Sequence, residues 1–102
     1  MNINSYAERM EAYALAIEKY GLETQVIVAI EEMSEVIKAL TKWLRCNTQA
    51  ETEKVMPSII EEVADAEIML EQIQTFFGIR VDVREAMDAK IKRLKERMKK
   101  DA

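Results

Sequence analysis

The sequence predicts an all-α fold, a four-helix bundle completed by oligomerisation. Only two glycines and one proline occur among 102 residues, and Glu, Lys, Ala, Met and Ile are abundant. Most of these residues lose little rotamer freedom in a helix. Apolar residues also recur at intervals of three and four, which is the period of an amphipathic helix. We expect one domain over residues 1–102.

The apolar content predicts self-association. Apolar residues make up 49% of the chain, and a domain of this size buries only roughly 60–70% of the surface that its unfolded chain exposes. One slim bundle cannot cover that much apolar surface, so we expect a homo-oligomer, either a dimer or a tetramer.

The first helix is predicted over Tyr6–Tyr20. Ser5 and Glu8 have the spacing of a capping box, and Gly21 is a typical C-terminal stop. A second helix is predicted from about residue 24 to residue 46. Its apolar stripe consists of Val26, Ile30, Met33, Ile37, Leu40 and Leu44.

The second half of the chain predicts two more helices. Residues 47–53 are polar and indicate a connection, and Pro57 disfavours helical backbone in the residue before it. Ser58 and Glu61 form another capping-box pattern, so a third helix should begin there and end at Gly78. Asp82 then resembles the cap of a last helix that continues to about residue 99.

The absent residue types exclude several chemistries. The chain has no histidine, and Cys46 is its single cysteine. An internal disulfide, a Cys/His zinc site and serine–histidine catalysis are therefore excluded. Carboxylates, lysines and arginines remain, and carboxylates favour hard cations such as Mg²⁺ or Mn²⁺.

Charge and hydropathy indicate which partners to expect. The net charge of −4 does not favour nucleic acid as a partner, and no apolar stretch approaches the ~20 residues that a membrane span needs. The first residues, including Asn2 and Asn4, lack the pattern of a secretory signal, so we expect a cytoplasmic protein.

Two acidic clusters carry the candidate chemistry: residues 31–35 (Glu-Glu-Met-Ser-Glu) and residues 61–65 (Glu-Glu-Val-Ala-Asp). Carboxylates three positions apart lie on one face of a helix. Glu32 with Glu35 and Glu62 with Asp65 could thus meet at one point if their helices pack antiparallel. Like charges destabilise one another, so such a group needs a divalent cation.

Ordinary solvated glutamates are the competing interpretation of these clusters. On a helical wheel Glu62 falls roughly 60–70° from the centre of the apolar arc, where a solvated glutamate is not expected. Glu35 points roughly opposite the main stripe of its helix, so it needs a second apolar contact to be buried in a site.

The two motifs, with 26 residues between Glu35 and Glu62, resemble those of the MazG-like all-α nucleoside triphosphate pyrophosphohydrolases, particularly small phage- or prophage-borne members. The resemblance covers about residues 24–97. It implies that Glu32, Glu35, Glu62 and Asp65 bind Mg²⁺ and form the catalytic site. It also implies hydrolysis of a nucleoside triphosphate to the monophosphate and pyrophosphate, as in sanitation of the nucleotide pool.

The family also carries a lysine and an arginine three residues apart in its last helix, for phosphate contact. Lys90 and Arg93 fit that spacing, although Asp88 stands where the family usually has asparagine. Lys38, one turn after Glu35, is a further phosphate-binding candidate. These cations also fit a solvated helix, because seven of residues 90–100 are Lys or Arg and cations favour a helix C-terminus.

A function of another class stays open. The chain could be a non-enzymatic helical dimerisation or regulatory module whose acidic residues lie on the surface. That alternative predicts no dependence on metal and a stability that is indifferent to Glu62.

Overall fold

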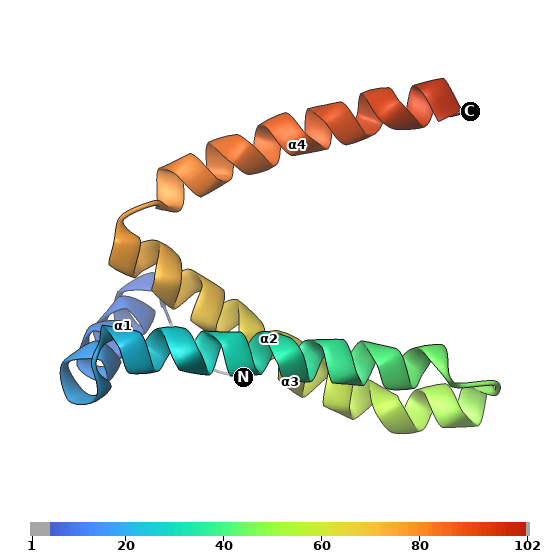
Figure 1. Cartoon of the computed structure of the whole chain (residues 1–102), viewed down its shortest axis with the longest axis horizontal. Coiled ribbons are helices and arrows are strands. Elements are labelled where there is room, and N and C mark those ends of the chain that lie inside the picture. Colours follow the sequence, from blue (N-terminus) through green and yellow to red (C-terminus); the bar gives the residue numbers. More distant parts are fainter. Residues whose placement is uncertain (1–4, 102) are drawn as a thin grey trace.

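The computed structural model describes residues 5–101, and this part of the chain is helical throughout apart from short connections (Figure 1). The helices are α1 (Tyr6–Tyr20), α2 (Leu22–Leu44), α3 (Gln49–Phe77) and α4 (Arg80–Asp101). The predicted all-α class with four helices is confirmed. No strand occurs in the described residues, whereas Asn2 and Asn4 lie outside them.

The α2–α3 hairpin is the centre of the molecule (Figure 1). Both helices pack along each other, and α1 lies across one end of the pair. The start of α4 contacts α3, and its Arg80 lies against Tyr6 of α1. None of the helices in residues 5–101 is long and apolar enough to cross a membrane.

The ends of α1 are those predicted. The Ser5 side chain accepts a hydrogen bond from the Glu8 N–H at 3.2 Å, and its hydroxyl donates to the Glu8 carboxylate at 3.1 Å. These two bonds anchor the first turn. Gly21 ends the helix with φ 87°, which is unfavourable for residues with a Cβ. α2 follows directly from Leu22.

The connection predicted over residues 47–53 is shorter than expected, because α3 already begins at Gln49, and the predicted third-helix start at Ser58 is wrong. Thr48 caps α3, accepting a hydrogen bond from the Glu51 N–H at 3.1 Å and donating one to the Glu51 carboxylate at 3.0 Å. Pro57 therefore lies inside the helix. A proline there costs roughly 3 kcal/mol, and α3 nevertheless continues through it, with Val55 and Ile59 half-buried on either side. α4 likewise begins at Arg80, before the predicted cap.

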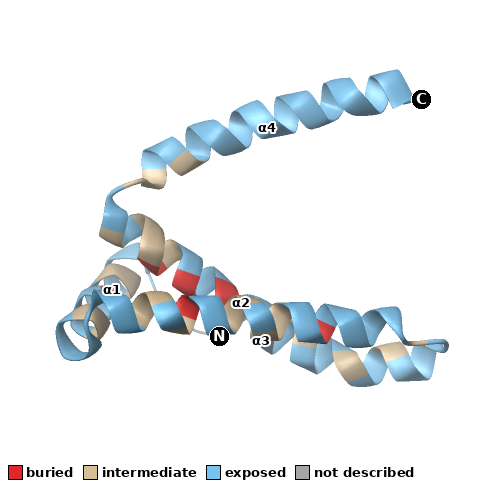
Figure 2. Cartoon of the chain, in the orientation of Figure 1, coloured by how far each residue is buried: buried red, intermediate tan, exposed pale blue. Residues whose placement is uncertain are grey.

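The hydrophobic core of the described residues is small (Figure 2), and three of its five apolar members are alanines. Ala29 and Ala39 on α2 and Ala66 on α3 are buried, which allows the two backbones to approach closely. The other buried residues of the described chain are Tyr13, Met69 and Gln72. The core thus joins α1, α2 and α3, and α4 contributes nothing to it.

A single copy leaves much apolar surface uncovered. Its accessible surface is 8354 Å², whereas a compact monomer of 11.8 kDa exposes about 5,900 Å². Its radius of gyration is 17.1 Å, against about 13 Å for a compact domain of this length. Exposed large apolar residues occur on all four helices, for example Leu15, Ile37, Ile60 and Leu94.

A polar cluster that the sequence did not reveal ties α1 to α3. The Arg9 Nε donates to the Glu71 Oε1 at 2.6 Å, and the Tyr13 hydroxyl donates to the same oxygen at 2.7 Å. Hydrogen bonds from Arg9 and then Tyr13 hold the pKa of Glu71 below its ordinary 4.5. Burial, together with the bond to Glu71, raises the pKa of Tyr13 to about 12.

We expect Glu71→Gln to destabilise the protein at pH 7 by about 1–3 kcal/mol, because charge-assisted hydrogen bonds are lost. A lowered folded pKa stabilises the fold above the unfolded pKa, and this contribution disappears as the pH falls through the folded pKa. The difference between variant and parent should therefore shrink below about pH 4.5. Urea unfolding at pH 7 and pH 3 measures it. Equal stability at pH 7 would show that the cluster contributes nothing.

Candidate metal centre

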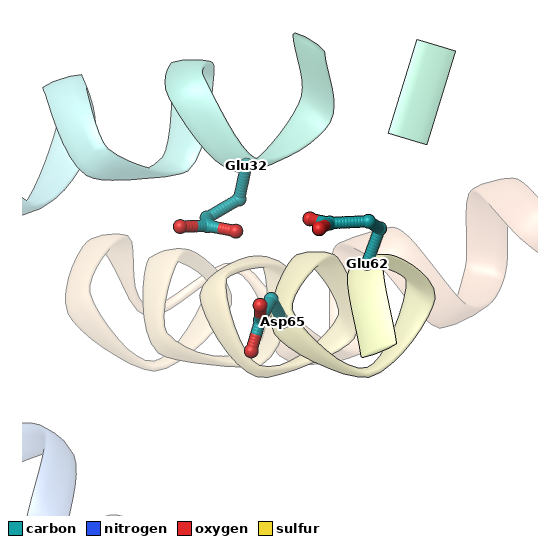
Figure 3. A group of neighbouring side chains, drawn as sticks. All are labelled: Glu32, Glu62 and Asp65. Carbon is teal, nitrogen blue, oxygen red and sulfur yellow. The ribbon is translucent and has the colours of Figure 1, made fainter. Parts of the chain in front are cut away.

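Three carboxylates from both acidic motifs meet across the α2–α3 hairpin (Figure 3). Glu32 extends from α2, while Glu62 and Asp65 extend from α3. One ligand oxygen from each residue lies within 4.8 Å of the other two. Glu62 and Asp65 share a face because they are three positions apart, and antiparallel packing sets Glu32 opposite them. The spacing along α3 and the packing of α2 against α3 together bring the three carboxylates close to one another.

The arrangement of the three carboxylates concentrates negative charge. Partial burial raises the pKa of Glu32, and the charges of Asp65 and Glu62 and a hydrogen bond with Asp65 raise it further. The described ion pairs instead join Arg9 to Glu71 and Lys38 to Glu35. Neither ion pair neutralises the carboxylates of Glu32, Glu62 and Asp65. Repulsion among these three charges therefore destabilises the folded state near neutral pH.

Glu35 lies outside this group. It is half-buried one turn beyond Glu32, and its carboxylate pairs with the Lys38 Nζ at 3.3 Å. Its charge contributes to the raised pKa of Glu32. The structure thus brings together three of the four predicted ligands, and a metal-binding role for Glu35 stays a prediction.

Lys90 and Arg93 lie away from the carboxylates within one chain. Both are exposed residues of α4, and α4 diverges from the hairpin after its first turns (Figure 1). Of the predicted phosphate-binding residues, only Lys38 is near the acidic group, through its contact with Glu35.

The geometry of the carboxylates fits a hard divalent cation. Such ions bind carboxylate oxygens at about 2.0–2.6 Å, which keeps oxygens around one ion within about 4–5 Å of each other. The three oxygens already meet this condition. The half-buried Glu32 and Glu62 and the exposed Asp65 also leave one side of the group open to a ligand from solvent.

Comparisons with known proteins identified no relative of this chain. No protein-family model matches the chain, and neither a curated protein nor a solved structure matches it. The fold and the site therefore define a class only: an all-α protein with a carboxylate group held across a helical hairpin.

Proposed function

We propose that this protein hydrolyses a nucleoside triphosphate between the α- and β-phosphates in a Mg²⁺-dependent reaction, giving a nucleoside monophosphate and pyrophosphate. The observation that carries the proposal is the meeting of Glu32, Glu62 and Asp65, which come from both acidic motifs. Nucleotide-pool sanitation in the cytoplasm is the role that fits this activity.

Each side chain has a defined task in this proposal. Glu32, Glu62 and Asp65 hold Mg²⁺, or alternatively Mn²⁺, and Glu35 lies next to them as a fourth ligand. When bound, the ion would neutralise phosphate charge and lower the pKa of an attacking water. Water adds to phosphorus, the bond to the pyrophosphate oxygen breaks, and one of the carboxylates accepts the proton of the water. Lys38 contacts a phosphate oxygen.

We infer that the active form is a homo-oligomer. The chain exposes about 2,400 Å² more than a compact monomer of its mass, and this excess lies in the range that obligate interfaces bury. Self-association also provides the second apolar contact that Glu35 needs to be buried.

The proposal is tested by pyrophosphate release from a panel of standard and modified ribo- and deoxyribonucleoside triphosphates. We expect turnover with Mg²⁺ or Mn²⁺ and none in EDTA, with the monophosphate as the second product. The panel also identifies the preferred base and sugar. Absence of pyrophosphate release from every nucleotide with either ion would contradict the proposal.

The exposed apolar surface also favours a second candidate, a helical dimerisation or regulatory module without catalysis. Its evidence is that large apolar side chains remain exposed on every helix. This candidate requires that metal ions change neither the stability nor the assembly of the protein, so the metal titration described in the Discussion separates the two functions.

A further inference from the structure

Beyond its first turns, the last helix lies apart from the other helices of residues 5–101 (Figure 1). α4 has 22 residues, none of them buried. Its apolar residues nevertheless form one stripe at intervals of three and four: Val83, Met87, Ile91, Leu94 and Met98. An isolated helix gains little stability from propensity alone, and amphipathic helices normally depend on packing. The stripe therefore indicates a surface on which α4 packs.

The corner between α3 and α4 holds α4 away from its own hairpin. Gly78 adopts the left-handed conformation with φ 62°, and the Ile79 N–H donates to the Gln74 carbonyl at 3.0 Å. The Arg80 guanidinium carbon lies 4.4 Å from the centre of the Tyr6 ring, which attaches the start of α4 to α1. In this geometry α4 diverges from its own α3 (Figure 1).

Charge indicates which surface α4 fits. α4 carries nine basic and five acidic residues, a net charge of +4. α2 and α3 together carry eleven acidic and three basic residues, a net charge of −8. Complementary potentials of this kind direct association and set its orientation. The acidic hairpin of a second copy is thus an electrostatically matched surface for α4.

The positions of the charges along the helices also match. Arg93 lies thirteen residues after the first residue of α4, about 20 Å from the corner at 1.5 Å per residue. Glu32 lies twelve residues before the last residue of α2, about 18 Å from the tip of the hairpin. Suppose that the α2–α3 connection of one copy lies next to the α3–α4 connection of the other. Arg93 of one copy and Glu32 of the other then lie at about the same height along the paired helices.

We propose that two copies clasp each other, with α4 of each copy lying along the α2–α3 hairpin of the other. Lys90 and Arg93 of one copy then face Glu32, Glu62 and Asp65 of the second copy and complete its site as phosphate-binding residues. The exposed surface in excess of a compact monomer is about three times the roughly 800 Å² that each partner buries in a standard interface. The clasp follows from the fold and charges, and only its catalytic consequence rests on the proposed function.

Cross-linking tests the clasp without any need for activity. A carbodiimide joins a lysine amine to a carboxylate in direct contact, and a co-refolded mixture of ¹⁴N- and ¹⁵N-labelled protein distinguishes links between copies from links within one copy. We expect mixed-isotope peptides that join Lys90 to α2 or α3. If every link from α4 to the hairpin has a single isotope composition, or if no such link forms, the proposal is overturned.

A matched pair of variants tests the apolar stripe. Leu94→Ser should convert the oligomer to a monomer in light scattering at micromolar concentration, whereas Lys92→Ser, two positions away and off the stripe, should leave the mass unchanged. Circular dichroism verifies that both variants remain helical. An oligomer that survives Leu94→Ser and Ile91→Ser together would overturn the assignment of this stripe to the interface.

Complementation connects the clasp with catalysis. Glu62→Gln and Arg93→Ala should each be inactive, but in a co-refolded mixture half of the dimers pair one copy of each. One of their two sites is then intact, so about a quarter of the parent activity should return. No recovery, despite mixed-isotope links, would overturn the role of Arg93 in the other copy's site. An inactive parent with such links would refute the proposed function and leave the clasp standing.

Discussion

Replacing Glu62 with glutamine should reduce pyrophosphate release at least about 100-fold while leaving the fold intact. Residues that merely orient metal ligands typically contribute 10–100-fold, so the loss of a ligand itself should cost more. Glutamine keeps the size of the side chain and removes only the negative charge. Because Glu62 is half-buried at the hairpin surface, the substitution opens no cavity. Initial rates at saturating Mg²⁺ measure the effect.

Two further variants give this prediction its specificity. Asp65→Asn should reduce the rate to a similar extent, since Asp65 belongs to the same carboxylate group. Glu67→Gln removes an equal charge from an exposed position of the same helix, outside that group, and should keep near-parental activity. If all three variants behave alike, the carboxylate group has no special role in catalysis.

Mg²⁺ should raise the thermal midpoint of the protein. A ligand that binds only the folded state stabilises it by about 2.7 kcal/mol when its free concentration is 100 times the dissociation constant. In a domain of this size that corresponds to a shift of about 10 °C or more. Thermal unfolding over a titration of MgCl₂ measures the shift, and NaCl at matched ionic strength is the control. A midpoint that responds equally to both salts would contradict a specific metal site.

Glu32→Gln should have opposite effects with and without metal. In the metal-free protein it should raise the midpoint near neutral pH, because the substitution removes a carboxylate whose pKa is raised by burial and by Asp65 and Glu62. A raised carboxyl pKa destabilises the fold above that pKa, and the penalty disappears as the pH falls. The advantage of the variant should therefore shrink as the pH falls through the raised pKa of Glu32, and it should be absent below about pH 4.5, the ordinary value.

In Mg²⁺ the same variant should lose the stabilisation seen in the parent, because a neutral amide is a poorer ligand for a hard cation. Glu67→Gln is again the matched control and should follow the parent in both conditions. A Glu32→Gln variant that is less stable than the parent without metal would show that the three carboxylates do not repel one another in solution.

Local sequence signals were sufficient for much of the helical framework. The Ser5 and Glu8 pair predicted the start of α1, and both glycines mark helix ends, as expected. Such signals act within one or two turns, so the sequence contains them complete. The third helix shows where this approach failed: Pro57 and the polar residues before it indicated a connection, but the cap at Thr48 and packing along α2 extend α3 through them.

For the candidate site, too, some features follow from local sequence and others only from helix packing. The sequence by itself determined the all-α class and the shared face of Glu62 and Asp65, because three-residue spacing on a helix is a local property. Only the tertiary structure decided that Glu32 joins them and Glu35 does not, that Glu71 binds Arg9 and Tyr13, and that α4 leaves its own hairpin. These contacts depend on how helices distant in sequence pack, and no local pattern encodes that packing.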